Sequence, residues 1–278
     1  MFFIYLLGQK AALKFGNFVS VFAYYFIPVR KKHVLESLSL SFPQKNKKEI
    51  QQTAKNVYKN FVRTVVEIMF FAKSDGETLR KLMVLENEAI AEKVFQNGKG
   101  AIFMSAHLGN WELAALSFSQ RHPMSVLVAK QSNPLIDALM NGVRTKLNGY
   151  KVICSDGIPY REVLKALKRN EFVAVLSDQD GGQQGCFVPF FGRLSSVPKG
   201  AAMFALRSGC PVITAFGVRQ PDGTTKACLE EIPLPNTGDA EKDIELICAA
   251  YSKKLENFVR TYPEQWFWFH RKWKTQKG

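Results

Sequence analysis

The amino-acid sequence predicts an α/β protein with a mixed, largely parallel sheet covered by helices, preceded by a helical N-terminal region. From residue 100 onward, short apolar runs alternate with segments of helical periodicity, which is the pattern of an α/β sheet. Before residue 75, the sequence shows two long helical patterns. We therefore expect a helical region over 1–75 and an α/β domain over 76–278.

The first helical pattern carries an aromatic face. Helical spacing relates five apolar residues, Phe15, Phe18, Val19, Phe22 and Phe26. Asn17, Ser20 and Tyr24 lie opposite, and the basic run 30–32 closes the segment. The longest uncharged run, 15–29, is shorter than the roughly 20 residues that a membrane-spanning helix needs. We expect an interfacial, membrane-associated helix; an ordinary core helix is the alternative.

The other elements follow from the period of the apolar residues. A second, amphipathic helix is predicted over 46–71. Strands are predicted over 101–106, 125–130, 151–155, 172–177 and 211–218, and helices are expected to begin near Asn110, Asn133, Pro159 and Pro198. In sheets of this kind, active residues gather where the parallel strands end.

Composition limits the possible partners. The chain has 38 basic and 24 acidic residues, a net charge of +14, which favours an anionic partner such as a nucleic acid, a membrane surface, or an acidic carrier protein or substrate. Its five cysteines are odd in number and include no C-x-x-C pair. We expect a reducing compartment, no disulfide framework and neither a metal nor a cofactor.

The sequence HLGNWE places two candidate catalytic residues at the end of the first predicted strand. His107 follows the strand, Asn110 is positioned to cap the next helix, and Glu112 falls in that helix's first turn. A carboxylate that binds one imidazole nitrogen leaves the other free to accept a proton from a hydroxyl. No G-x-S-x-G motif supports a covalent acyl-enzyme. The alternative is a histidine that is simply hydrogen-bonded in the core.

Further candidates lie in later segments. Asp178 and Asp180 end a predicted strand, but the remaining ligands of a calcium loop are missing, so we expect them to orient basic neighbours or substrate, or to cap a loop. The segment CFVPFFG suits either an acyl-chain slot or the core. PEQWFWFHRKWK combines Trp266, Trp268 and Trp273 with basic residues, as membrane interfaces do; single-stranded nucleic acid is the alternative.

Five sequence blocks together resemble one known family. HLGNWE, SNPLID (132–137), SDQD (177–180), FVPFFG (187–192) and PEQWFWFHRKWK (263–274) occur in this order, and the chain resembles the bacterial lipid A late acyltransferases, the lauroyl and myristoyl transferases. H-x4-E alone is a weak motif, whereas the five blocks are specific. Relatives often have an arginine shortly before the Asn of the second block, where this chain has Lys130.

The resemblance implies an enzyme that moves a fatty acyl chain from a thioester donor, acyl carrier protein or acyl-CoA, to a hydroxyl of a lipid A precursor. His107 is then the general base and Glu112 its orienting partner. The residues expected to bind substrate are Lys130, Asn133, Arg144, Arg161, Asp178, Asp180 and Arg271. Expected localisation is the cytoplasmic face of the cell inner membrane, peripheral or monotopic, with no nucleic-acid partner. Alternatives are transfer to another glycolipid or lysophospholipid, or a non-enzymatic, basic membrane- or nucleic-acid-binding protein.

Overall fold

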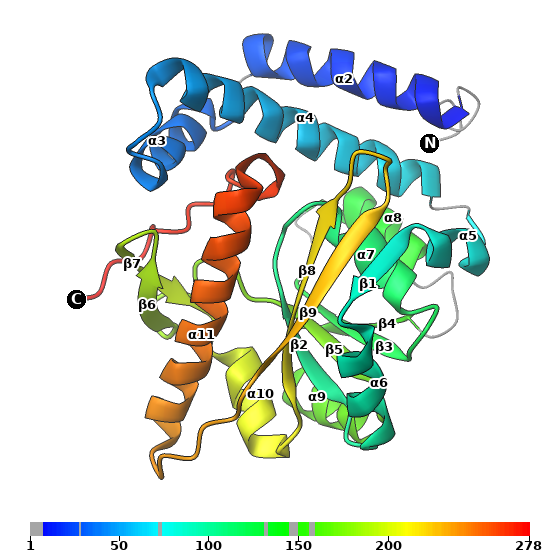
Figure 1. The fold of residues 1–278 in the computed structure, drawn as a ribbon, viewed down its shortest axis with the longest axis vertical. Coiled ribbons are helices and arrows are strands. Elements are labelled where there is room, and N and C mark those ends of the chain that lie inside the picture. The colour runs from blue at the N-terminus through cyan, green and yellow to red at the C-terminus, as the bar shows by residue number, and fades with distance from the viewer. Residues whose placement is uncertain (1–7, 28, 72–73, 131–132, 145–149, 156–158) are drawn as a thin grey trace.

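The computed structural model describes residues 8–27, 29–71, 74–130, 133–144, 150–155 and 159–278, and shows a layer of helices above an α/β body (Figure 1). The body contains a seven-stranded sheet in the order β1-β9-β8-β2-β5-β3-β4. These strands are β1 (Met83–Glu86), β2 (Ala101–Ser105), β3 (Met124–Val128), β4 (Tyr150–Cys154), β5 (Phe172–Leu176), β8 (Val212–Arg219) and β9 (Thr225–Ile232).

The strand directions confirm the predicted sheet. β2, β3, β4, β5 and β8 run parallel to one another, whereas β9 is antiparallel to β8 and carries β1 parallel to itself at the edge. The five predicted strands agree with β2, β3, β4, β5 and β8 to within about two residues. β1, β9 and the separate hairpin of β6 (Cys186–Phe190) and β7 (Arg193–Val197) were not predicted.

Both faces of the sheet are covered. On one face, Ile102 and Met104 belong to the same core cluster as α9 (Pro159–Lys168), α10 (Gly200–Ser208) and α11 (Ala240–Thr261). On the other, Phe103 packs with residues of α5 (Gly76–Lys81), α6 (Glu88–Gln96) and α7 (Trp111–Phe118). Burial on both faces explains why β2 and β5 consist almost entirely of apolar residues.

The N-terminal helices form the outer layer in Figure 1, where α4 (Lys47–Phe71) lies between α2 (Gly8–Phe26) and the α/β body. A short helix, α3 (Lys31–Ser41), joins them. α2 buries Ala12, Gly16, Ser20 and Tyr24. A Cβ on Gly16 would lie 3.0 Å from Cγ2 of Val66, so a glycine at this position lets the two helices approach closely.

The predicted aromatic face of α2 points to solvent. Phe15, Phe18, Phe22 and Phe26 are 47, 68, 45 and 72% exposed, whereas Ser20 and Tyr24 on the opposite side are buried. The alternative in which this aromatic face packs into the core is therefore wrong. Within the described residues no single helix is long and apolar enough to cross a bilayer; Ala11–Phe26 and Lys31–Ser41, bent by 94°, reach that length and composition only as a pair.

The C-terminal segment lies inside the protein, contrary to the prediction of an aromatic membrane interface. Trp266, Trp268 and Trp273 are at most 9% exposed, and they contact Phe190 and Phe191 of the β6–β7 hairpin. The segment CFVPFFG therefore supplies core residues and not an acyl-chain slot. Lys272, also expected at the interface, is 2% exposed, and burial lowers its pKa to about 8.

Candidate active site

The register of β2 and β5 brings His107 and Asp178 together. Ser105 pairs with Leu176 at the carboxyl ends of these neighbouring strands. Two residues after each of them, the candidate catalytic residue His107 contacts the buried Asp178. His107 Nδ1 lies 2.8 Å from Asp178 Oδ1, and the backbone N–H of His107 donates to Asp178 Oδ2 at 3.0 Å. The indole N–H of Trp266 donates to the same Oδ2 at 2.9 Å.

These contacts fix the charge of Asp178 and the tautomer of His107. Burial alone would raise the pKa of Asp178, but the neighbouring His107 and the N–H groups that donate to the carboxylate lower it to about 2. An ionised carboxylate only accepts hydrogen bonds, so Nδ1 of His107 carries the proton that lies between them. The other ring nitrogen, Nε2, is then the basic one.

Glu112 does not bind His107, and that part of the sequence prediction is wrong. Its Oε2 accepts from Nε of Arg144 at 2.9 Å, and its Oε1 accepts from Nη2 of the same guanidinium. Both side chains are 7% exposed. Burial alone would lower the pKa of Arg144, but its hydrogen bonds and ion pair with Glu112 raise it. In H-x4-E, Glu112 is therefore paired with Arg144, and the carboxylate that contacts the ring of His107 is that of Asp178.

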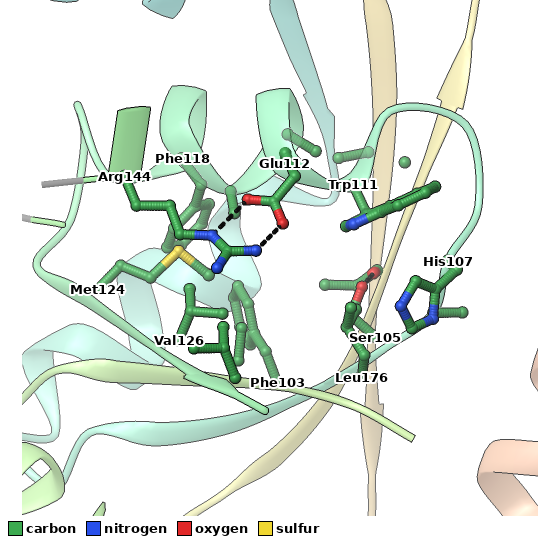
Figure 2. Close-up of a pocket in the computed structure, with 18 of the residues that line it drawn as sticks. Phe103, Ser105, His107, Trp111, Glu112, Phe118, Met124, Val126, Arg144 and Leu176 are labelled. Atoms are coloured by element: carbon green, nitrogen blue, oxygen red, sulfur yellow. Dashed lines mark hydrogen bonds and ion pairs between the residues drawn. The ribbon is translucent and has the colours of Figure 1, made fainter. Parts of the chain in front are cut away.

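A cavity of about 550 Å³ lies beside these residues, between α7 and the sheet. Figure 2 shows His107 and Trp111 on one side of it and the Glu112–Arg144 pair on the other, nearer to Phe118 and Met124. Most of the lining is apolar and comes from β1, β2, β3, β5, β8, β9, α4 and α7. A volume in the hundreds of Å³ with few polar groups is typical of a site for an apolar ligand.

Aromatic rings enclose the histidine. The ring centroids of His107 and Trp111 are 4.9 Å apart with their planes near perpendicular, and Phe267 lies 5.9 Å from His107. The side chain of His107 keeps 18% exposure, whereas that of Asp178 has 2%. The histidine is thus held from behind by a buried carboxylate and opens toward the cavity.

The other predicted substrate-binding residues are dispersed. Lys130 is exposed and follows Ala129, which lines the cavity. Asn133 caps α8 (Pro134–Arg144), where its side chain accepts from the N–H of Leu135 at 2.9 Å. Arg161 and Arg271 are exposed, and neither lines the cavity.

Asp180 lies next to the C-terminal segment and not in the cavity. Its Oδ2 accepts from the hydroxyl of Thr275 at 2.7 Å, and its backbone N–H donates to Nε2 of His270 at 2.8 Å. The structure therefore brings together four of the predicted site residues, His107, Glu112, Arg144 and Asp178, and Asp178 makes the contact with His107 that was expected of Glu112.

Sequence reasoning missed several residues of the site. Trp111 and Phe267 flank His107, Gln179 lines the cavity, and Trp266 donates to Asp178. Trp111 lies within HLGNWE, so the motif itself was the available signal. Trp266 and Phe267 lie in PEQWFWFHRKWK, where composition gave no indication that the segment folds back onto the histidine.

Comparison with known proteins shows the family of the chain. The family model for bacterial lipid A biosynthesis acyltransferases matches residues 1–275. The chain is 29% identical over 257 residues to the lipid A biosynthesis lauroyltransferase of Escherichia coli (strain K12), covering 90% of this chain and 81% of that protein. It is 24% identical over 251 residues to the myristoyltransferase of the same strain, covering 89% of this chain and 76% of that protein.

A further relative is named for a different acceptor. The phosphatidylinositol mannoside acyltransferase of Mycolicibacterium smegmatis is 24% identical over 182 residues, which cover 63% of this chain and 57% of that protein. The non-enzymatic alternative is wrong, since the family match and these relatives all indicate an acyltransferase. The chain belongs to the bacterial lipid A biosynthesis acyltransferase family and is an acyltransferase.

Proposed function

We propose that this enzyme transfers a fatty acyl chain from a thioester donor, with acyl carrier protein as the natural carrier, to a hydroxyl group of a lipid A precursor. The observation that carries the proposal is His107 at the edge of a large apolar cavity, with Nδ1 held by a buried, ionised Asp178. A fixed imidazole beside an apolar slot is what the attack of a hydroxyl on a lipid thioester requires.

In the proposed reaction, Nε2 of His107 accepts the proton of the acceptor hydroxyl, and the hydroxyl oxygen attacks the thioester carbonyl carbon. The resulting tetrahedral intermediate collapses, the C–S bond breaks, and the proton on His107 passes to the leaving thiolate. Asp178 stays ionised and stabilises the transient imidazolium. α7 begins at Trp111, next to His107, so the backbone N–H groups of its first turn and its positive dipole end are suited to the oxyanion.

The cavity is the proposed site of the acyl chain. Its walls include Phe103, Val126 and Leu176 from the sheet and Phe118 from α7 (Figure 2). Burial of each methylene of a fatty acyl chain contributes about 0.8 kcal/mol, so a lining of this kind binds a long chain without polar contacts. In this account the ion pair of Glu112 and Arg144 shapes one wall and takes no part in proton transfer.

We further propose that the enzyme works on the cytoplasmic face of the inner membrane, as a peripheral or monotopic protein, with the aromatic face of α2 in contact with lipid. The exposed apolar residues of α2 and its following turn lie beside Lys31 and Lys55, which also contact Tyr24 or Tyr25. Aromatic rings combined with lysines suit the headgroup region of an anionic membrane.

The basic residues of the protein suit both an acceptor that carries phosphates and an acidic donor protein. Arg271 and Lys130 are exposed cations available to acceptor phosphates, and the excess of basic residues suits an acidic carrier protein. With a carrier-borne donor, the rate should therefore fall more steeply with salt than with a small acyl thioester. Equal salt slopes would favour acyl-CoA as the natural donor.

Mass spectrometry of lipid A from a host that lacks its own late acyltransferases tests the function. Cells that express the wild-type protein should gain lipid A species heavier by one acyl chain, and cells with His107→Ala at equal protein level should not. Unchanged lipid A with a change in another lipid would contradict the lipid A acceptor.

Transfer to another glycolipid is the second candidate. The similarity to the phosphatidylinositol mannoside acyltransferase supports it, because a base beside an apolar slot does not by itself select one sugar hydroxyl. The same mass spectra separate the two candidates, since the acyl chain would then appear on a phospholipid-anchored glycolipid and not on lipid A.

A further inference from the structure

The loop that carries His107, residues 107–110, is held by hydrogen bonds from two segments, the C-terminal segment and α4. The backbone N–H of Phe267 donates to the carbonyl oxygen of His107 at 3.0 Å, and the N–H of Gly109 donates to the carbonyl oxygen of Gln265 at 2.9 Å. From α4, the hydroxyl of Thr64 donates to the carbonyl oxygen of Gly109 at 2.9 Å.

Gly109 shows how tightly this loop is packed. Its φ of +59° lies in the left-handed region, and a Cβ at this position would lie 2.5 Å from the carbonyl oxygen of Gly217 in β8. Neither the conformation nor the space suits a larger residue. The loop is therefore packed closely against the backbone of β8, and it is hydrogen-bonded to the backbone of the C-terminal segment and to side chains of α4.

A buried ion pair between α4 and the end of β8 connects these supports. Nη2 of Arg219 lies 2.7 Å from Oε2 of Glu67, and Nε lies 3.0 Å from Oε1. Both side chains are 5% exposed. Burial would raise the pKa of Glu67, but Arg219, Asn110 and Arg63 together lower it, so the carboxylate is ionised.

Glu67 contacts the 107–110 loop directly, and Arg219 contacts two residues that hold it, Thr64 and Gln265. Glu67 Oε2 accepts from the side-chain amide of Asn110 at 3.0 Å, while Oδ1 of that asparagine caps α7 by accepting from the N–H of Leu113 at 3.1 Å. Arg219 donates to the hydroxyl of Thr64 at 2.9 Å, and its backbone N–H donates to the side chain of Gln265 at 2.8 Å.

Neither Glu67 nor Arg219 lines the cavity, although Thr64 and Gly217 beside them do. Buried ion pairs are weak contributors to net stability, because desolvation offsets the attraction between the charges. What this pair does provide is geometry. It fixes the start of α7, where Trp111 and Glu112 lie, relative to the loop that presents His107.

We propose that Glu67 and Arg219 are positioning residues, which hold the 107–110 loop and the start of α7 in the geometry needed for acyl transfer and so make α4 part of the active site. This inference rests on the proposed function. The two residues are 152 positions apart in the sequence and outside all five blocks that carry the family resemblance.

Steady-state kinetics of Arg219→Gln and Glu67→Gln test the proposal, with turnover expressed per folded molecule. We expect kcat to fall about 10-fold or more, since displacement of a catalytic group by an ångström costs on the order of 100-fold, with KM for donor and acceptor within about twofold. The pH dependence of kcat/KM should stay as in the wild type, because the contact between Asp178 and His107 is intact.

Arg63→Gln is the matched control. Arg63 also donates to Glu67, at 2.8 Å, but its side chain is 29% exposed. Among the described residues the structure gives it no hydrogen bond to Thr64, the residue through which the side chain of Arg219 reaches the loop. This variant should keep kcat within about twofold. An equal loss in Arg63→Gln, or wild-type kcat per folded molecule in Arg219→Gln, would overturn the proposal.

Chemical rescue separates positioning from a general loss of fold. Millimolar guanidinium, compared with potassium chloride at equal ionic strength, should restore part of the kcat of Arg219→Ala and leave Arg63→Gln unchanged. Should Arg219→Ala not fold, Arg219→Lys serves instead and should show reduced kcat with normal KM. Absence of rescue in a folded Arg219→Ala would count against the proposal, and absence of any transfer by the wild-type enzyme would count against the proposed function itself.

Discussion

Replacement of Glu112 by glutamine distinguishes an ion-pair role from a catalytic one. In the structure the carboxylate of Glu112 holds both Nε and Nη2 of Arg144, and His107 is held instead by Asp178. Glu112→Gln leaves a guanidinium that is 7% exposed without its counter-charge. The expected primary effect is therefore on stability.

The magnitude follows from this burial. Loss of one partner of a buried ion pair costs about 3–5 kcal/mol, which for a chain of this size lowers Tm by roughly 10 °C. Glu112→Gln combined with Arg144→Met removes both charges and should recover most of that loss, because the pair lies in an otherwise apolar wall. Arg144→Met alone, which strands the carboxylate, should resemble Glu112→Gln.

Thermal melts and kcat per folded molecule, measured on all three variants, test the reasoning. We expect kcat of Glu112→Gln to fall far less than that of His107→Ala, and the double variant to regain stability. A Glu112→Gln enzyme with wild-type Tm and a kcat as low as that of His107→Ala would refute the ion-pair role and return Glu112 to the proton-transfer machinery.

Three further predictions concern the membrane, pH and the acceptor. Phe18→Ser with Phe22→Ser should reduce recovery with anionic vesicles in a flotation assay at unchanged Tm, and Leu135→Ser, at a residue 81% exposed on α8, should not. Asp178 has a pKa of about 2 against an ordinary 3.8, so its ionised form stabilises the fold above pH 4 by about 2 kcal/mol. This stabilisation should disappear as the pH falls toward 2. In thermal melts measured across this pH range, Asp178→Asn should lack that part of the loss of stability in acid. Arg271→Ala should raise KM for a phosphorylated acceptor and not for its dephosphorylated form, whereas equal changes would exclude a phosphate contact.

The sequence predicted the α/β architecture because local periodicity determines most of it. Runs such as 101–106 and 172–177 are apolar except for one serine each and of strand length, which is the pattern of central parallel strands. β1 and β9 lie at an edge of the sheet, and β9 alternates buried with more exposed residues in TKACLEEI, so neither forms a comparable apolar run. The chain direction at that edge depends on tertiary pairing, which periodicity does not report.

Four residues of the candidate site were predicted, but their pairings were not. Glu112 was paired with His107 because it is near in sequence, whereas the true partner, Asp178, is 71 residues away and adjacent only through the register of β2 and β5. Such long-range contacts leave no spacing signal in a single sequence. For the same reason Glu67 and Arg219 were not recognised.

The aromatic C-terminal segment shows a different limit. A segment rich in tryptophan and lysine can lie at a membrane interface or in a folded core with buried polar contacts. Trp266 and Lys272 are buried because the C-terminal segment folds back onto the protein. Each donates to the segment that follows β5, Trp266 to the carboxylate of Asp178 and Lys272 to the carbonyl oxygen of Gln179. Composition cannot distinguish these two environments.

The most direct test of the account is reconstituted transfer from an acyl carrier thioester to a purified lipid A precursor, followed by the mass of the acceptor. The wild-type enzyme should add one acyl chain; His107→Ala and Asp178→Asn should melt as folded proteins and lose about 100-fold or more in rate, because one lacks the base and the other holds it in the wrong tautomer. Transfer by either variant at the wild-type rate would contradict the central claim that Asp178 orients His107 as the base.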